Sequence, residues 1–379
     1  MHVVKAHGES AKVQRDSIAA IALLAADNTF NATALGDEGA CEAVAAALRK
    51  GAEDARLLRS SLDAVVALGP HQVNADRLVA AGACRALAAI LTSESALCHP
   101  DMRLRAVQSA SALGKFHTAA LEDAGVCEGL ISTLDRHPDE LILQGMGMCS
   151  ISILAARAVN RDRLATAGAA QAALRAIRAF PDNELLQIHA FMAVQVLASN
   201  SDASRMKLRE AGGCELCIAL LSDAAQSATL EVKALSALHD LISRCFQTYD
   251  NDAVIAAVSA TMHADLHHQT DALKAAFSKP PPSCAPASFD VNAVCTAVAA
   301  AMHAHTDHHM LQQMGATFFT IVAQAADRQC HAQLRTCGAL AAVRNAQQAH
   351  PQCDVLQAAA LRGYARGSAQ VKSTRRCRR

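Results

Sequence analysis

The chain has 379 residues, of which 52% are hydrophobic and 18% charged, so it is too apolar to be disordered. Eighty-five residues are alanine, tryptophan is absent and there are 9 phenylalanines and 2 tyrosines, which excludes an aromatic-rich β-sandwich and favours closely packed helices. Basic and acidic residues number 35 each, so no overall charge surplus points to nucleic acid or to a basic partner.

The compartment is predicted from the cysteines and from the apolar runs. Fourteen cysteines in a large alanine-rich chain favour free thiols in a reducing compartment such as the cytoplasm. Residues 1–30 have the pattern of an amphipathic helix rather than a signal peptide. No apolar run reaches the length of about 18 residues that a membrane span requires, so we expect none.

A glycine recurs at a nearly constant interval and marks an internal repeat. The intervals between successive anchor glycines are 43, 43, 43 and 44 residues, through Gly39, Gly82, Gly125, Gly168 and Gly212. Residues 1–25 resemble the pattern that follows an anchor, so we expect the given sequence to begin inside a repeat. Two later copies carry Ala253 and Ala293 in the glycine position, and Gly338 restores it. Eight anchors predict about eight to nine repeats of 40–45 residues.

Each repeat is expected to contain a short, a longer and a longest helix. In one copy, residues 160–167 form the short helix, which ends at Gly168 in the left-handed conformation that glycine adopts without strain. Residues 169–180 form the second helix, which Pro181 ends, and Asp182 or Asn183 caps the third. One such unit cannot bury its own apolar faces, so neighbouring repeats are expected to stack.

This pattern resembles the armadillo repeat, with HEAT repeats as the nearest rival. The likeness rests on the spacing Asn160, Leu164, Gly168, on the proline that ends the second helix and on the long alanine-rich third helix. The arrays it resembles are the alanine-rich armadillo regions of leucine-rich-repeat kinases and of vacuolar-fusion armadillo proteins. The resemblance implies an all-α, right-handed superhelical solenoid over residues 1–366, followed by a basic tail at 367–379.

Armadillo proteins that clamp extended peptides carry an asparagine ladder on the long helices, often with tryptophan one turn earlier. The positions aligned with the asparagines hold Leu23, Ala67, Ala112, Ile153, Val196, Asp240 and Ile321. Those aligned with the tryptophans hold Ala19, Asp63, Gln108, Cys149, Met192, Ser236 and Thr317. A peptide backbone is clamped by side-chain amides that both donate and accept, so we do not expect nuclear import receptor activity.

The cysteines and histidines are the candidate metal ligands of the sequence. Cys41, Cys84, Cys127, Cys214 and Cys295 share one position two residues after their anchors, a full repeat apart, which predicts small buried core residues rather than a shared metal. Cys214 and Cys217 form a Cys-x-x-Cys pair. No second such pair accompanies it, so we do not expect a zinc or redox site there. The histidine runs at 263–268 and 303–309 are expected to be structural, because His137, His305 and His350 share a turn position, and a metal or pH-sensing site is the alternative.

Three segments depart from the repeat. Residues 279–290 are proline-rich and predict the loss of an ordinary first helix, as a surface loop, a hinge or a polyproline-type ligand. The tail could serve targeting, contact RNA or anionic lipid, or dock on an acidic groove, through Lys372, Arg375, Arg376, Arg378 and Arg379. Residues 91–100 contain an insertion. The connection near residues 115–120 is correspondingly shorter, so the length of the repeat is kept.

The function expected from these features is a non-catalytic scaffold or adaptor that binds a protein partner along the concave groove. No nucleophile, phosphate-loop or dinucleotide motif is present, so we expect no enzyme, cofactor, metal or small-molecule substrate, and nucleic acid only through the tail. The alternative is a structural subunit of a large ciliary or organellar assembly, docked through the solenoid surface and tail. The expected groove residues are Asp63, Gln108, Met192 and Asp240.

Overall fold

The computed structural model describes residues 10–51, 54–93, 99–199, 201–222, 227–242, 291–324, 334 and 336–357. The described part is all α-helical, as predicted. The chain divides into two compact units, Met1–Ala211 and Gly212–Arg379, and each is described by itself. The predicted proline-rich segment 279–290, the copy near Ala253, the histidines at 263–268 and the tail at 367–379 lie outside the described residues. The extent of the repeat region, 1–366, therefore stays a prediction.

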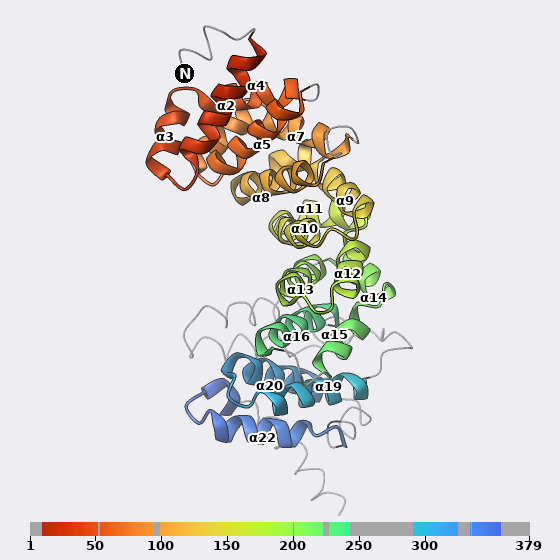
Figure 1. Cartoon of the computed structure of the whole chain (residues 1–379). Helices are drawn as coiled ribbons and strands as arrows, with labels where there is room; N and C mark the ends of the chain where they lie inside the picture. The colour runs from red at the N-terminus through yellow and green to blue at the C-terminus, as the bar shows by residue number, and fades with distance from the viewer. Residues whose placement is uncertain are drawn as a thin grey trace, which may run out of the picture. The chain divides into compact units, whose positions relative to one another are not determined.

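The first unit repeats the predicted order of short, longer and longest helix (Figure 1). The short helices are α3 (Thr29–Asp37), α6 (Gln72–Ala80), α11 (Ala158–Ala167) and α14 (Asp202–Glu210). The second helices are α4 (Ala40–Lys50), α7 (Ala83–Thr92), α9 (Val126–Arg136) and α12 (Ala169–Ala179). The long helices are α2 (Ala11–Ala25), α5 (Ala55–Leu68), the first part of α8 (Pro100–Asp123), α10 (Leu141–Leu154) and α13 (Glu184–Ala198).

The second unit continues the pattern in its described residues. It contains α15 (Gly213–Leu221), α16 (Ala228–Ile242), α19 (Val291–Ala304), α20 (His309–Gln324) and α22 (Ala339–Ala349). Here α15, α19 and α22 are second helices, and α16 and α20 are long ones. Ala293 was placed in the glycine position, but it lies inside α19, because alanine lets a helix continue where glycine would end it.

Every described anchor glycine has the left-handed backbone predicted for Gly168. The φ angles are 90° at Gly39, 88° at Gly82, 83° at Gly125, 101° at Gly168, 86° at Gly212 and 83° at Gly338. At each site a second helix follows directly, so the glycine turns the chain into that helix without a longer loop. A side chain at such a φ angle costs about 1–2 kcal/mol, which is why one residue type recurs there.

The helix caps follow the sequence as well. The Asn183 side chain accepts a hydrogen bond from the backbone N–H of Leu186 at 2.9 Å, so Asn183 rather than Asp182 caps α13. In α8 a long and a short helix run together, with non-helical angles only at His117 (φ −127°, ψ 45°). The two-residue turn seen at Gly69 and Pro70 is missing there, which is the predicted compensation for the insertion before Pro100.

Polar side chains connect each repeat to the one before it. The Nδ2 of Asn160 donates to the carbonyl of Thr118 at 3.2 Å, and the hydroxyl of Thr133 donates to that of Leu91 at 3.1 Å. Both bonds span 42 residues, one repeat. The buried alanines and leucines between the helices supply the core, and these bonds add polar connections between neighbouring repeats.

Candidate partner-binding surface

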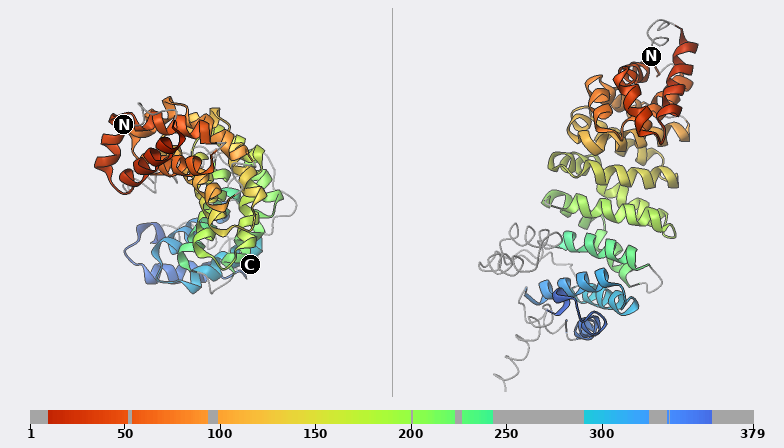
Figure 2. Two further views of the ribbon diagram at one scale, coloured as in Figure 1. Left: turned by 45° about the horizontal axis from the view of Figure 1, so that its top comes forward. Right: turned by 90° about the vertical axis from the view of Figure 1, so that its left-hand side faces the viewer.

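The long helices of the first unit lie side by side and share one partly exposed face. Helix α5 packs on α8, α8 on α10, and α10 on α13. In the right-hand view of Figure 2, the yellow and light-green helices run parallel in successive layers. The face of α10 that is not buried carries Ile142, Gly145, Cys149 and Ile153. The same positions 43 residues later on α13 are Leu185, Ile188, Met192 and Val196. We call this face of α5, α8, α10 and α13 the long-helix surface.

The structure places three of the expected groove residues on this surface. Asp63 on α5, Gln108 on α8 and Met192 on α13 are all half-buried and occupy equivalent positions in their repeats. Asp240 is also half-buried but lies on α16, in the second unit, where its carboxylate is 3.4 Å from Nδ1 of the neighbouring His239. The tail residues Lys372 to Arg379 lie outside the described residues.

At the α5–α8 end, the long-helix surface is charged and internally paired. Asp63 forms an ion pair with Arg105 of α8, and Arg59 pairs with Asp101 at 3.2 Å. Each pair joins two neighbouring long helices, so these charges already have partners of opposite sign. The Arg59–Asp101 pair is exposed, and because exposed ion pairs contribute at most about 1 kcal/mol, a ligand with its own charges can compete with it.

At the α10–α13 end, the surface is apolar, which the sequence analysis missed. The side chains of Ile142 and Leu185 are 67% and 65% exposed, and they occupy equivalent positions on adjacent long helices. Leu141 is exposed beside Ile142, and Ile188 and Met192 continue the apolar face of α13. The 43-residue interval between Ile142 and Leu185 was the available signal, but α10 is apolar on every side, so periodicity could not separate its outer residues from its core.

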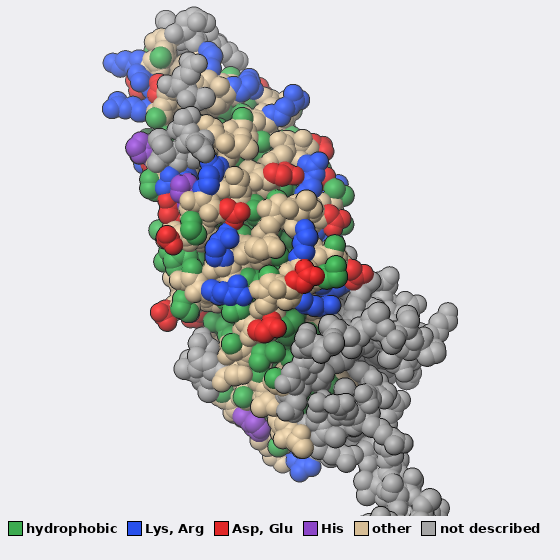
Figure 3. All heavy atoms as spheres, turned by 90° about the vertical axis from the view of Figure 1, so that its right-hand side faces the viewer, with side chains coloured by type: hydrophobic (Ala, Val, Ile, Leu, Met, Phe, Trp, Pro, Cys, Tyr) green, Lys and Arg blue, Asp and Glu red, His purple; other side chains and the backbone are tan. Residues whose placement is uncertain are grey.

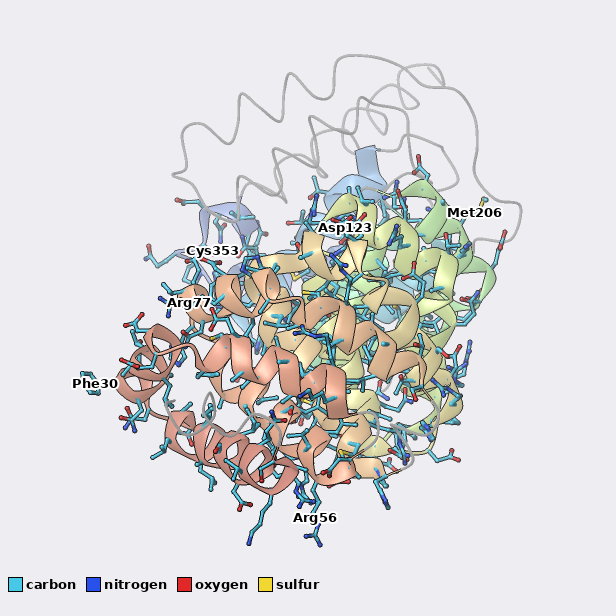
Figure 4. The ribbon with its side chains drawn as sticks, turned by 90° about the horizontal axis from the view of Figure 1, so that it is seen from above. Phe30, Arg56, Arg77, Asp123, Met206 and Cys353 are labelled. Carbon is cyan, nitrogen blue, oxygen red and sulfur yellow. The ribbon has the colours of Figure 1, made fainter. Side chains whose placement is uncertain are left out.

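Two other exposed parts of the first unit differ from this surface. Figure 3 views the side where α9, α12 and α14 lie in Figure 1, and acidic and basic side chains are intermingled there. Arg175 of α12 and Asp135 of α9 form one ion pair across repeats. Single apolar residues at the starts of the short helices are exposed too, such as Val73 (55%) and Val159 (51%), and Phe30 projects away from α3 (Figure 4).

The positions aligned with the asparagine ladder need one correction. On α2 the buried residues are Ile18, Ile21, Ala22 and Ala25, each 43 residues before a buried residue of α5. This register aligns Ala20 with Asp63 and Leu24 with Ala67, one residue later than the expected Ala19 and Leu23. The aligned residues remain alanine and leucine, so the predicted absence of an amide ladder on α2 is unchanged.

The cysteines in the shared position are core residues, as predicted. Cys41, Cys84, Cys127, Cys214 and Cys295 are all buried. Burial raises the pKa of Cys41 and of Cys127 to about 12 and that of Cys84 to about 11. Burial also raises the pKa of Cys217 well above its ordinary value. These four thiols, of Cys41, Cys84, Cys127 and Cys217, are therefore protonated at neutral pH and are poor nucleophiles.

The described histidines of the 303–309 run contact protein groups. Nε2 of His305 lies 3.4 Å from the carboxylate of Glu231, and Nδ1 of His308 accepts a hydrogen bond from the N–H of Leu311 at 3.3 Å. His309 packs edge-on against His350. Within the described ranges, no group of three or more His, Cys, Asp or Glu side chains is arranged to hold a metal ion.

Comparisons with known proteins show the fold. No protein-family model and no curated protein sequence matches the chain. Among solved structures, a designed armadillo repeat protein, YIII(Dq)4CqI, aligns with a TM-score of 0.53 and 19% identity over 61% of this chain and 94% of its own. A second, YIII(Dq.V1)4CPAF in complex with the peptide (KR)4, gives a TM-score of 0.54 and 18% identity over 63% and 97%. Computationally designed armadillo repeat proteins for modular peptide recognition give 0.55 and 18% over 63% and 97%.

The fold is thus an armadillo-repeat solenoid, as the sequence resemblance implied. The specific likeness to the armadillo regions of leucine-rich-repeat kinases stays a prediction. In the part of the chain that the structure describes, no helix combines the length and apolar character needed to cross a membrane.

Proposed function

We propose that the chain is a non-catalytic scaffold or adaptor that binds a protein partner on the long-helix surface. The observation that carries this proposal is the pair Ile142 and Leu185, two large aliphatic side chains about two-thirds exposed at equivalent positions on adjacent helices. Such an exposed apolar pair favours association with a partner. A partner that covers it removes apolar area from water, which stabilises the complex by about 25 cal/mol per Å². The designed neighbours made for peptide recognition support the same use of the fold.

The chemistry of the surface supports a particular kind of partner. The α10–α13 end, with Ile142, Leu185 and Met192, fits apolar side chains, and the α5–α8 end, with Asp63 and Gln108, fits polar groups that replace the existing ion pairs. A protein segment with an apolar stretch followed by a polar stretch matches both ends. Asp240 belongs to the equivalent face of α16 in the second unit.

The test compares two matched pairs of substitutions in the full chain. Ile142→Asp with Leu185→Asp places charges on the long-helix surface, and Val73→Asp with Val159→Asp places them at similarly exposed positions on short helices. Tagged variants are expressed in cells, and co-purifying proteins are quantified by mass spectrometry after thermal melting confirms folding. We expect the first pair to remove specific partners and the second to retain them. The reverse pattern would contradict the proposal.

The alternative, a structural subunit of a large assembly, depends on the basic tail, where five of the last eight residues are Lys or Arg. Deletion of residues 372–379 separates the two functions. A partner bound on the long-helix surface is retained after the deletion, whereas an assembly docked through Arg375, Arg376, Arg378 and Arg379 is lost. Size-exclusion profiles of cell extracts distinguish these outcomes.

A further inference from the structure

Two cysteines from neighbouring repeats meet in the second unit. Cys337 directly precedes the left-handed Gly338 that starts α22, and Cys295 lies on α19, which packs against α22. A Cβ atom at Gly338 would lie 4.0 Å from the Cβ of Ala299, one helical turn after Cys295. The backbone path therefore brings residue 337 alongside Cys295, and the two sulfur atoms lie close enough for a hydrogen bond between a thiol and a thiolate.

The surroundings of Cys337 stabilise its thiolate. The hydrogen bond from Cys295 is the main reason that the pKa of Cys337 falls to about 6. Burial acts in the opposite direction, and the backbone N–H groups of Ala339 and of Cys337 itself add to the lowering. Cys337 is only partly buried, whereas Cys295 is buried.

This pair does not occur in the other described repeats. The residue before the anchor glycine is Glu38, Ala81, Ala124, Ala167 or Ala211 elsewhere, so Cys41, Cys84 and Cys127 do not face a cysteine at that position of the next repeat. Cys41, Cys84 and Cys127 share the position of Cys295 and behave as core residues. The second thiol is thus an addition to one repeat and not a requirement of the fold.

We propose that Cys337 is a modification site for low-molecular-weight disulfides such as oxidised glutathione, with Cys295 as the resolving thiol. The Cys337 thiolate attacks one sulfur of the disulfide, whose S–S bond breaks and releases one glutathione thiolate. Cys295 then gives up its proton and attacks the Cys337 sulfur of the mixed disulfide, expelling the second glutathione thiolate, which takes up that proton. Two protein thiols are oxidised to one disulfide, and one glutathione disulfide is reduced to two thiols.

The first measurement is the pH dependence of iodoacetamide alkylation on the reduced full chain, followed at each cysteine by peptide mass spectrometry. We expect the Cys337 rate to have its midpoint near pH 6. At that pH the rate is expected to exceed that of an ordinary thiol by about tenfold, because the larger thiolate fraction outweighs the lower nucleophilicity of a low-pKa thiol. A midpoint near the ordinary value of about 8.5 would overturn the proposal.

The second measurement uses oxidised glutathione and two variants. The unmodified sequence is expected to form a Cys295–Cys337 disulfide with little mixed disulfide. Cys295→Ala is expected to raise the alkylation midpoint of Cys337 and to accumulate the glutathione adduct at that residue. Cys127→Ala, which removes the thiol from the same position in another repeat, is the control and is expected to behave as the unmodified sequence. Equal accumulation of the adduct in all three proteins would rule out Cys295 as the resolving thiol.

Discussion

The side-chain amide of Asn74 donates a hydrogen bond to the backbone carbonyl of Ala32, 2.8 Å away in the preceding repeat. Both groups are buried, and the Oδ1 atom lies against Gly36, where a Cβ would come within 1.9 Å. The short helix of one repeat is thereby fixed to the short helix of the repeat before it, through the residue that begins the Asn-x-x-x-Leu-x-x-x-Gly pattern.

Replacement of Asn74 by alanine should reveal the strength of this connection. The buried hydrogen bond to the carbonyl of Ala32 would be lost, so we expect the free energy of unfolding to fall by about 0.5–1.5 kcal/mol. Urea denaturation measures the difference. Asn31→Ala is the matched control, because its bond to the Leu24 carbonyl is solvent-exposed and should contribute less. Equal losses in the two variants would contradict this account.

The left-handed glycines make a second prediction. At Gly125 (φ 83°) the nearest atom to an added Cβ would be Glu128 Oε2 at 3.8 Å, so alanine would fit sterically but strain the backbone. We expect Gly125→Ala to destabilise the protein by about 1–2 kcal/mol. Gly145→Ala, in the middle of α10 with nothing within 4 Å, should instead stabilise it by about 1 kcal/mol. Opposite shifts of the thermal midpoint are the measurement.

A glutamine on the long helix makes a third prediction. Nε2 of Gln187 donates to the carbonyls of Ile177 at 2.7 Å and of Phe180 at 2.9 Å, and so caps the end of α12. Gln187→Glu would replace this donor with a buried carboxylate facing two carbonyls, at an expected cost of at least about 3 kcal/mol near pH 8.

The cost of Gln187→Glu should depend on pH in a defined direction. Burial disfavours the ionised carboxylate, so the pKa of the introduced side chain is raised in the folded state. The loss of stability should therefore shrink as pH falls toward the unfolded pKa of about 4.3 and grow above it. Urea unfolding at pH 5 and pH 8 tests this. Gln195→Glu, at a half-exposed position of the same helix, should show little of either effect.

The buried thiols make a fourth prediction, at alkaline pH. Because the pKa of Cys127 is raised to about 12 in the fold, while an unfolded thiol ionises near 8.5, the folded state retains a proton that the unfolded state loses. Stability should fall above pH 9 by about 1.4 kcal/mol per pH unit for each such thiol. Cys127→Ala should reduce the dependence of stability on pH by about 1.4 kcal/mol per pH unit, the contribution of one thiol. Alanine is accommodated at this position, because Ala170 occupies it in α12. An unchanged slope would contradict the assignment.

The features that could be predicted from the sequence are those that recur at the same position in each repeat and depend on local backbone chemistry. The spacing of Gly39 to Gly212 predicted the repeat, the left-handed turns and the helix order, because each depends on local backbone chemistry. The capping by Gln144, Gln187 and Gln312 was not predicted, although each lies at the same distance after its anchor position, because seeing it requires knowing that this position points back to the end of the second helix.

The candidate site was predicted less well, for two physical reasons. Asp63, Gln108 and Met192 were placed on the partly exposed face by the repeat register, but Ile142 was missed because α10 has no polar side to contrast with its core. The Cys295–Cys337 pair was missed because its members occupy different positions of the repeat, and only the packing of α19 on α22 makes those positions adjacent.

The bonds that span one repeat also bear on how such a chain can change length. Residues 126–168 form one complete period, and their removal would join Gly125 directly to Ala169, leaving a second helix after a left-handed glycine. Gln187 would still cap α12, and donors that reach back one repeat would meet the equivalent carbonyl of the repeat before. Gene duplication or deletion of 43 codons therefore preserves the hydrogen-bonding pattern, whereas the gain or loss of a few residues must be balanced within the same repeat, as it is between Ser93 and His117.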